Sequence, residues 1–249
     1  MLKARIIPVL TFNGFALVKT RNFDNPRMVG NPIQSARVFN SRNVDELIFL
    51  DIKATKENRK LNLNLVEKVI NECFMPVGIG GGIKNLNDIN NLLKIGADKV
   101  VIKTEAILNP TFIKKASDFF GSSCISISVD IIRDKNSNKK IFFDQNQIDM
   151  KEFLIEMESN GAGEFIINDV SNDGVMNGFD SILFKEINEM ISLPFVPVGG
   201  GGKLEHYSEL FKNSNCYAVG SSSIFSFTRF TPNDIKNELS RINVPVRLI

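Results

Sequence analysis

The chain has 249 residues, 43% of them hydrophobic, and its 30 Lys and Arg against 28 Asp and Glu leave a formal net charge of +2. A charge so close to zero gives no reason to expect nucleic acid or membrane as a partner, and no apolar run suggests a signal peptide or a transmembrane span. Three dispersed cysteines without C-x-x-C spacing predict reduced thiols in the cytoplasm rather than a disulfide framework or a zinc site. We expect neither a metal nor a cofactor.

Short apolar segments alternate with stretches of helical periodicity along the whole chain. The clearest helix is predicted over 61–73, where Leu61, Leu65 and Val69 belong to one apolar stripe. Continuous apolar runs are typical of parallel strands that are covered on both faces. The predicted strands are 6–10, 47–52, 76–79, 100–102, 124–129, 164–168, 195–198 and 217–219. Eight βα units predict a single TIM-barrel domain over 1–249, with a doubly wound open sheet as the alternative.

The second half of the chain repeats features of the first. Segment 46–52 (ELIFLDI) is echoed by 164–170 (EFIINDV) at an offset of 118 (164 − 46), and the glycine runs at 78–82 and 199–202 lie a similar distance apart. Segment 5–11 corresponds to 124–130, but the first ends in Thr11 and the second in Asp130. A period this long excludes short solenoid repeats and indicates two fused half-barrels.

The residue at which each strand stops is the one to inspect, because chemistry in a TIM barrel takes place at the carboxyl ends of the strands. A polar residue or glycine lies at or just beyond the point where each apolar run stops, which predicts a functional rim. The rim consists of Thr11, Asp51, Gly80, Thr104, Asp130, Asp169 with Asp173, Gly200 and 221–223.

The two glycine runs predict two phosphate sites. Glycine lets backbone N–H groups approach an anion at the start of the next helix, although a purely structural turn is the alternative for each run. Because Ser or Thr follows each run one strand later, and the two sites lie across the barrel, we predict a small ligand with a phosphate at each end. The predicted phosphate-binding residues are Gly81, Gly82, Lys103, Thr104, Asp173, Gly174, Gly200, Gly201, Ser222 and Ser223.

Asp130 is the first candidate for acid–base catalysis, because it ends an apolar strand and should face the barrel mouth. A capping or salt-bridged aspartate is the alternative, and Asp51 and Asp169 carry the same ambiguity. Lys19 lies in a polar segment, 19–24, that could form a mobile lid over a phosphate; a solvated loop lysine is the alternative.

A second set of charges opens the strands at their other ends. Arg5, Glu46, Lys99 and Glu164 each immediately precede or begin an apolar run. Such charges normally only face solvent at the bottom of the barrel. Two positive and two negative groups around the barrel axis, however, could form a plug across the barrel.

Six segments together make the chain recognisable. Residues 3–8, 45–51, 77–83, 96–100, 161–164 and 244–248 resemble the cyclase subunit of imidazole glycerol phosphate synthase, the HisF family, and the resemblance covers essentially the whole chain. It implies a duplicated TIM barrel that binds a two-phosphate substrate at its top and docks a HisH-type glutaminase at its bottom. Ammonia then passes along the barrel axis, through a charged gate that Arg5, Glu46, Lys99 and Glu164 match.

The same match implies residue roles at the top of the barrel. Lys19 resembles the family's loop lysine. Gly82 and Thr104 resemble residues of one of the family's phosphate sites. Gly174, Gly200 and the serines near 222 resemble residues of the other phosphate site.

The chain departs from the family in the residues that carry the cyclase chemistry. The family's chemistry resembles a two-carboxylate mechanism, with one aspartate after the first strand and another after the fifth. In this chain the second position is Asp130, but the first is Thr11. Loss of a general acid or base typically lowers a rate 10²–10⁴-fold, so we expect impaired cyclisation. Thr20 also stands where the family usually has glycine. Segments 7–10, 17–20 and 25–27 look like the WbuZ branch, which is associated with surface-glycan synthesis.

Three functions compete at this point. The leading hypothesis is a barrel that stimulates a glutaminase and supplies ammonia to a separate sugar amidotransferase. The second is a working cyclase of histidine biosynthesis, in which Asp51 or another carboxylate compensates for Thr11. The third is a stand-alone phosphosugar isomerase, against which Thr11 also counts.

Overall fold

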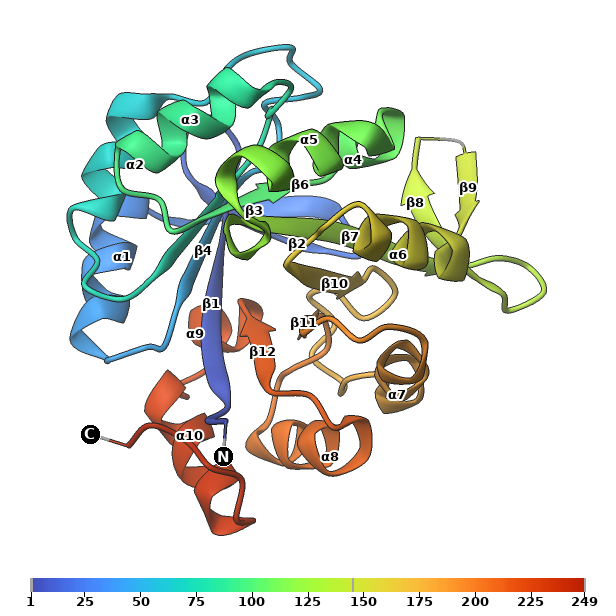
Figure 1. The fold of residues 1–249 in the computed structure, drawn as a ribbon. Coiled ribbons are helices and arrows are strands. Elements are labelled where there is room, and N and C mark those ends of the chain that lie inside the picture. Colours follow the sequence, from blue (N-terminus) through green and yellow to red (C-terminus); the bar gives the residue numbers. More distant parts are fainter. Residues whose placement is uncertain (1, 145, 249) are drawn as a thin grey trace.

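The computed structural model describes residues 2–144 and 146–248. Eight parallel strands close into a barrel, because β7 pairs with β10 and β12 pairs with β1 (Figure 1). This confirms the predicted TIM barrel and excludes the open sheet. The barrel strands are β1 (Arg5–Phe12), β4 (Leu47–Asp51), β5 (Val77–Gly80), β6 (Lys99–Ile102), β7 (Ile125–Arg133), β10 (Glu164–Asp169), β11 (Phe195–Val198) and β12 (Ala218–Ser221).

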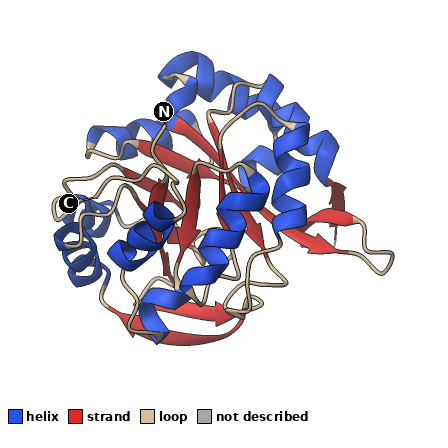
Figure 2. Cartoon of the chain, turned by 90° about the horizontal axis from the view of Figure 1, so that it is seen from below, coloured by secondary structure: helices blue, strands red, loops and turns tan. Residues whose placement is uncertain are grey.

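Helices surround the strands on the outside, as the view from below shows (Figure 2). They are α1 (Pro32–Ser41), α2 (Leu63–Ile70), α3 (Leu86–Lys94), α4 (Thr104–Leu108), α5 (Pro110–Phe120), α6 (Met150–Ser159), α7 (Ser181–Met190), α8 (Leu204–Ser214), α9 (Ser223–Phe227) and α10 (Pro232–Arg241), with a 3-10 turn, η1 (Ser122–Cys124). Side-chain N-caps begin several of them; in α10, Thr231 and Asp234 form a reciprocal capping box. Within the described residues, no helix is long and apolar enough to cross a membrane.

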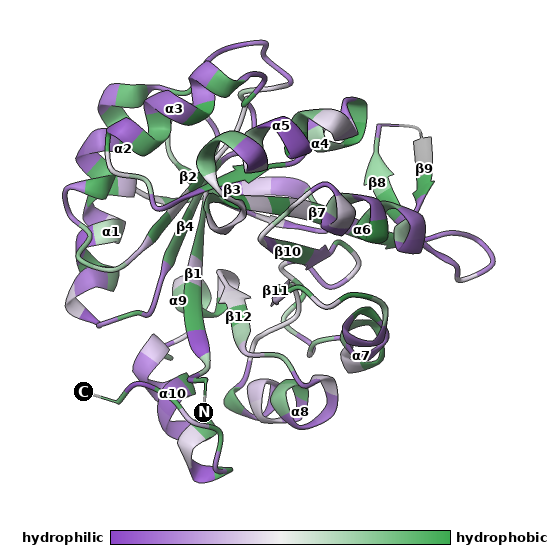
Figure 3. Ribbon diagram, viewed as in Figure 1, coloured by the Kyte–Doolittle hydropathy of each residue, from purple (hydrophilic) through white to green (hydrophobic). Residues whose placement is uncertain are grey.

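The apolar side chains form two layers. A large outer cluster fills the space between the strands and the helices, and hydropathy varies along the helices while the barrel strands are mainly hydrophobic (Figure 3). A smaller cluster lies inside the barrel, because alternate residues of each strand point to the axis. The inner cluster consists of Ile7, Val9, Ile48, Val101, Ile166, Val196, Val198 and Ala218, with Leu50 packed against it.

Two antiparallel hairpins extend the sheet, and the sequence did not predict either of them. β2 (Leu17–Arg21) and β3 (Asp24–Gly30) follow β1, whereas β8 (Lys139–Phe143) and β9 (Asn146–Asp149) follow β7. β3 is almost wholly exposed, so it lacks the apolar pattern that identifies a strand. The rings of Phe23 and Phe142 lie 6.5 Å apart and join the two hairpins.

The C-terminal segment is fastened to the start of the barrel. The backbone N–H of Ala4 donates to the carbonyl of Pro245 at 2.7 Å, and Ala4 pairs with Val246. Lys236 of α10 is 1% exposed, and its ammonium donates to Asp45 Oδ1 and to the Asn43 carbonyl, each at 2.9 Å.

Replacing Lys236 with methionine should therefore destabilise the fold strongly, because the Asp45 carboxylate stays buried without its cation. Breaking such a pair costs about 3–5 kcal/mol. The control is Arg241→Met in the same helix, because the Arg241 side chain is 75% exposed in its pair with Glu238. That change should cost less than about 1 kcal/mol. Urea unfolding measures both; equal losses of unfolding free energy would contradict the buried anchor.

Candidate functional site

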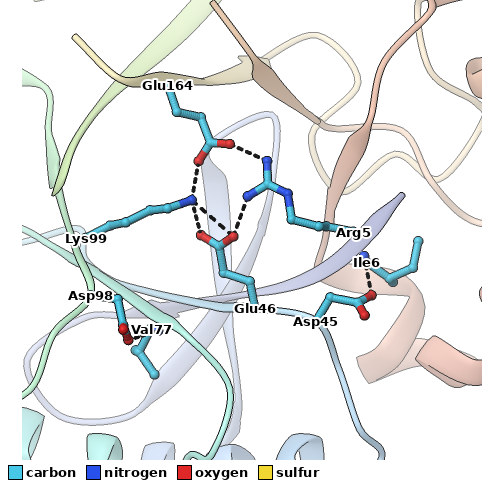
Figure 4. Close-up of polar contacts among 8 residues, drawn as sticks. All are labelled: Arg5, Ile6, Asp45, Glu46, Val77, Asp98, Lys99 and Glu164. Atoms are coloured by element: carbon cyan, nitrogen blue, oxygen red, sulfur yellow. Dashed lines mark hydrogen bonds and ion pairs between the residues drawn. The ribbon is translucent and has the colours of Figure 1, made fainter. Parts of the chain in front are cut away.

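Four charged side chains form a closed ring at the amino ends of the barrel strands (Figure 4). Arg5 donates to Glu46 at 2.5 Å and also to Glu164. Lys99 donates to Glu46 at 2.9 Å and to Glu164 at 2.8 Å. The predicted gate residues thus meet around the axis, with two cations alternating with two carboxylates. We call this group the gate ring.

The two carboxylates of the gate ring favour the charged state of Arg5. Burial lowers the pKa of Arg5, but the negative charges of Glu164 and Glu46 outweigh burial, so the pKa lies above its ordinary value. The side chains of Glu46 and Glu164 are 3% and 7% exposed, so each buried carboxylate needs its two cations as partners. The ring has no net charge and crosses the barrel as a neutral layer.

Two aspartates hold the strands that supply the ring. Asp45 precedes Glu46 and accepts a hydrogen bond from the backbone N–H of Ile6 at 2.9 Å. Asp98 precedes Lys99 and accepts one from the N–H of Val77 at 2.8 Å (Figure 4). Each carboxylate therefore satisfies the first free N–H of a neighbouring strand and fixes the register of the gate residue beside it.

At the other end of the barrel, Asp130 lies in a polar cluster. It is 6% exposed and forms an ion pair with Lys103. The side-chain amide of Asn168, its partner in the register of β7 and β10, donates to Asp130 Oδ1 at 3.4 Å. Lys103, predicted to bind phosphate, thus also balances the charge of the candidate acid–base residue.

Thr11 forms no hydrogen bond with a carboxylate of the described residues and joins a different network. Its hydroxyl donates to the carbonyl of Val18 and accepts from Lys19 Nζ at 3.4 Å. Lys19 also donates to Ser222 Oγ and, at 2.9 Å, to the carbonyl of Val9. The structure therefore brings Thr11, Lys19 and Ser222 together.

Lys19 is buried in β2, which excludes the interpretation as a solvated loop lysine. It is 5% exposed, and burial lowers its pKa to about 8, an effect that the charge of Asp173 opposes. An amine with such a pKa exchanges protons near neutral pH more readily than an ordinary lysine.

Asp173 is a carboxylate of the mouth whose pKa is shifted by its surroundings. Burial raises its pKa to about 6; the charge of Asp130 adds to this rise, whereas Thr20 and Lys19 lower it. Thr20 donates to Asp173 at 3.0 Å, and the backbone N–H of Asn22 donates to the Asp173 carbonyl at 2.8 Å. The β2–β3 hairpin is thus docked on the turn that follows β10.

Asp51 and Asp169, which the sequence left ambiguous, are bound in structural networks. Arg59 forms two hydrogen bonds with Asp51, at 2.5 and 2.7 Å, and Asp51 also accepts from two backbone N–H groups of the next turn. Arg133 reaches Asp169 at 3.2 and 3.4 Å. Both carboxylates cap the turn after their strand, so neither is free to act as a base.

The glycine runs are required by close packing at symmetric places. A β-carbon on Gly81 would lie 2.5 Å from the Asp51 carbonyl oxygen, and one on Gly199 would lie 2.7 Å from that of Asp169. Both glycines have positive φ, 121° and 101°. Gly200 also has no room for a side chain, because a β-carbon on it would lie 2.0 Å from the carbonyl oxygen of Gly178. Structure alone therefore explains these glycines.

Four glycines of these runs have backbone N–H groups without a backbone acceptor in the described part of the chain. Such groups are the donors that an anion site uses, so they are consistent with the predicted phosphate sites. One lysine stands beside each site: Lys103 immediately precedes α4, which begins at Thr104, and Lys19 contacts Ser222, which precedes α9. The four glycines are Gly81, Gly82, Gly200 and Gly201.

Gly174 belongs to the hairpin contact. A β-carbon there would lie 2.0 Å from the carbonyl oxygen of Thr20, so only glycine lets the β2–β3 hairpin dock. Ser223 is buried at the start of α9.

Sequence reasoning did not identify three residues of the mouth: Arg59, Arg133 and Asn168. The period-two alternation of β10 does indicate Asn168, because Glu164 faces the axis and every second residue follows it. No sequence signal pairs Arg59 or Arg133 with its aspartate. Among the residues that the structure describes, no group of three or more His, Cys, Asp or Glu is placed to hold a metal ion.

The burial of Lys19 predicts a pH-dependent stability. Its folded-state pKa of about 8 lies below the ordinary value of 10.5, so the unfolded chain binds the proton more tightly. Stability should rise with pH between these values. Relative to Lys19→Met, the unfolding free energy of the wild type should rise by up to about 3 kcal/mol over this range.

Urea unfolding of both proteins across this pH range measures the difference. Lys114→Met, which removes an exposed lysine of α5, should retain the pH dependence of the wild type. A difference between the wild type and Lys19→Met that stays constant with pH would show that the ammonium of Lys19 is solvated.

Comparison with known proteins agrees with this geometry. The family described as "Histidine biosynthesis protein" matches residues 5–231. Proteins named "Imidazole glycerol phosphate synthase subunit HisF" are 37% identical in Clostridium botulinum (strain Langeland), over all of both chains, and 37% identical in Staphylococcus saprophyticus, over 99% of this chain and all of the relative. A protein of the same name in Methanococcus vannielii is 35% identical over the full length of both. The chain therefore belongs to the HisF family of histidine biosynthesis proteins.

Proposed function

We propose that the chain is the synthase subunit of a glutamine amidotransferase complex. A HisH-type glutaminase docks at the amino ends of the strands, and its ammonia passes through the gate ring to the barrel mouth. The relatives support the broad assignment, because each is named as a subunit of imidazole glycerol phosphate synthase. The gate ring is the single observation that carries the proposal.

A charged ring with no net charge suits a passage for a small neutral molecule. The ring is tied together by hydrogen bonds, so opening it means exchanging partners rather than removing a charge from the barrel. Above it lies the inner apolar cluster, where a charged ammonium ion would be strongly disfavoured. Neutral ammonia can therefore pass where the ion cannot.

Exposed apolar side chains surround the gate end of the barrel. Phe74 is 94% exposed in the segment before β5, and Phe119 is 72% exposed near the end of α5. Leu2 and Tyr217, 71% and 54% exposed, precede β1 and β12. Large exposed aromatic and aliphatic groups at one end of a molecule are typical of a protein interface. This face is the proposed glutaminase surface.

The barrel mouth supports use of the ammonia outside the usual cyclisation. Near the end of β1, the Thr11 hydroxyl is held by Val18 and Lys19, and no carboxylate of the described residues accepts its proton. Asp130 alone remains of the expected pair of aspartates. The glycine N–H groups without a backbone acceptor support binding of a phosphorylated ligand at the mouth. We therefore propose that a separate sugar amidotransferase, in surface-glycan synthesis as in the WbuZ branch, consumes the ammonia.

One observation favours a second candidate, a working cyclase of histidine biosynthesis. Asp51 cannot compensate for Thr11, because Arg59 binds it. Asp173 is the better substitute, since its pKa of about 6 and its place beside Lys19 suit a general acid or base. The names of the relatives favour this candidate as well.

The docking surface can be tested with exposed residues that the barrel does not need. Phe74→Glu and Phe119→Glu should weaken binding of the HisH-type glutaminase by about 10-fold or more, because each places a charge in an apolar contact. Phe15→Glu is the matched control, since Phe15 is 83% exposed at the opposite end of the barrel. Titration by calorimetry measures the affinities. Equal effects of all three changes, or no complex with the wild type, would contradict the proposal.

The cyclase question is decided by turnover with ammonium and the bis-phosphate ribonucleotide of histidine biosynthesis. We expect the wild type to fall short of an ordinary rate, about 1 s⁻¹, by roughly 10²–10⁴-fold. Thr11→Asp should recover part of this loss, because its carboxylate would lie beside the Lys19 ammonium.

Steady-state and single-turnover assays of both proteins separate the candidates. An ordinary rate in the wild type would establish the cyclase instead. In that case Asp173→Asn should remove the activity, whereas a poor rate in the wild type leaves ammonia supply as the function.

A further inference from the structure

Two buried polar atoms inside the barrel have no hydrogen-bond partner among the described residues: the hydroxyl oxygen of Ser126 and the amide oxygen of Asn168. Ser126 is 1% exposed. A buried polar group without a partner is unfavourable, so each such atom needs an explanation. Both lie on the seam between β7 and β10.

Ser126 faces the axis of the barrel directly above the gate ring. Its register partners are Glu164 of the ring on one side and Val101 of the inner apolar cluster on the other. Side chains that share a register position in a parallel sheet point to the same face. The Ser126 hydroxyl is therefore a polar group in the path that leads from the ring to the mouth.

Asn168 lies at the upper end of the same seam, beside Asp130. Its amide nitrogen donates to the Asp130 carboxylate at 3.4 Å. This contact sets the orientation of the amide, because the reverse orientation would put its oxygen against a carboxylate. The free oxygen is thus an acceptor at the mouth. Ser128 lies midway, two residues from Ser126 and on the same face, so each step is about 6–7 Å.

The chemistry of the seam restricts what can bind there. The ligand must be small, because apolar side chains fill the barrel interior. It must be neutral, because the gate ring uses all of its own charges and the region above it is apolar. It must also donate and accept hydrogen bonds. Ammonia meets all three conditions, since its lone pair accepts from a hydroxyl and its N–H groups donate to an amide oxygen.

We propose that Ser126 is an ammonia-binding position above the gate ring, and that the Asn168 amide oxygen receives the ammonia at the mouth beside Asp130. The inference rests on the proposed function and adds the residues that guide the ammonia between its two ends. Ser126 acts as a positioning residue, because it holds ammonia and takes no part in the chemistry.

The test compares Ser126→Val with Ser126→Thr, which have nearly the same shape and differ in the hydroxyl. Thermal unfolding is followed in ammonium chloride and in sodium chloride at equal ionic strength, below and above the pKa of ammonium. Above that pKa, ammonium chloride should raise the midpoint of the wild type and of Ser126→Thr by about 1 °C when free ammonia equals its Kd. The rise should be absent in Ser126→Val, and absent in all three proteins at the lower pH.

Three results would overturn the inference: no rise in the wild type, an equal rise in Ser126→Val, or an equal rise at both pH values. A crystallographic peak beside Ser126 in both salts, without the ammonium-dependent rise, would identify an ordered water instead. None of these measurements needs a glutaminase. Failure of the glutaminase to bind would overturn the proposed function, while this test would still report separately on ammonia binding.

Discussion

The pairing of β7 with β10 closes the sheet, and the arrangement of all the chemical groups depends on that closure. In a closed parallel barrel every strand begins at one end and finishes at the other, and alternate side chains face one axis. Charges that open the strands must therefore meet at the bottom, and residues that end them must meet at the top. The inner apolar cluster fills the space between.

Buried charges are paired differently at the two ends of the barrel. At the bottom, each carboxylate of the gate ring contacts both cations, so the ring is complete without a ligand. At the top, Asp130 is paired with Lys103, but Lys19 is buried beside hydroxyl and carbonyl groups, and the pKa values of Lys19 and Asp173 move toward neutrality. The gate end is thus electrostatically satisfied, whereas the mouth keeps groups that can exchange protons or bind an anion.

The half-barrel duplication persists where packing requires it, and it is broken at the barrel mouth, where Thr11 corresponds to Asp130. Asp51 and Asp169 hold equivalent places, and a glycine from the next strand packs against the backbone of each. Their arginine partners come from unrelated places, Arg59 from the turn after β4 and Arg133 from β7. Thr11 and Asp130 are likewise equivalent in position, but only Asp130 retains a carboxylate. Packing constrains both halves equally, whereas the side chains at the barrel mouth can differ between them.

The order of residues was enough to predict the eight barrel strands, the two kinds of strand end and the members of the gate ring. These features are local, because an apolar run with a charge before it and a polar residue after it is visible without knowing its neighbours. Tertiary structure alone decided which groups meet. Lys19 and Ser222 are 203 residues apart in the chain, and Lys103 and Asp130 are 27 apart. The hairpins after β1 and β7 were likewise revealed only by the tertiary structure, because strand pairing rather than an apolar pattern stabilises them. The unpartnered atoms of Ser126 and Asn168 could be identified only in the closed barrel. Whether a buried polar atom has a hydrogen-bond partner depends on all the residues around it, and the sequence does not show which residues those are.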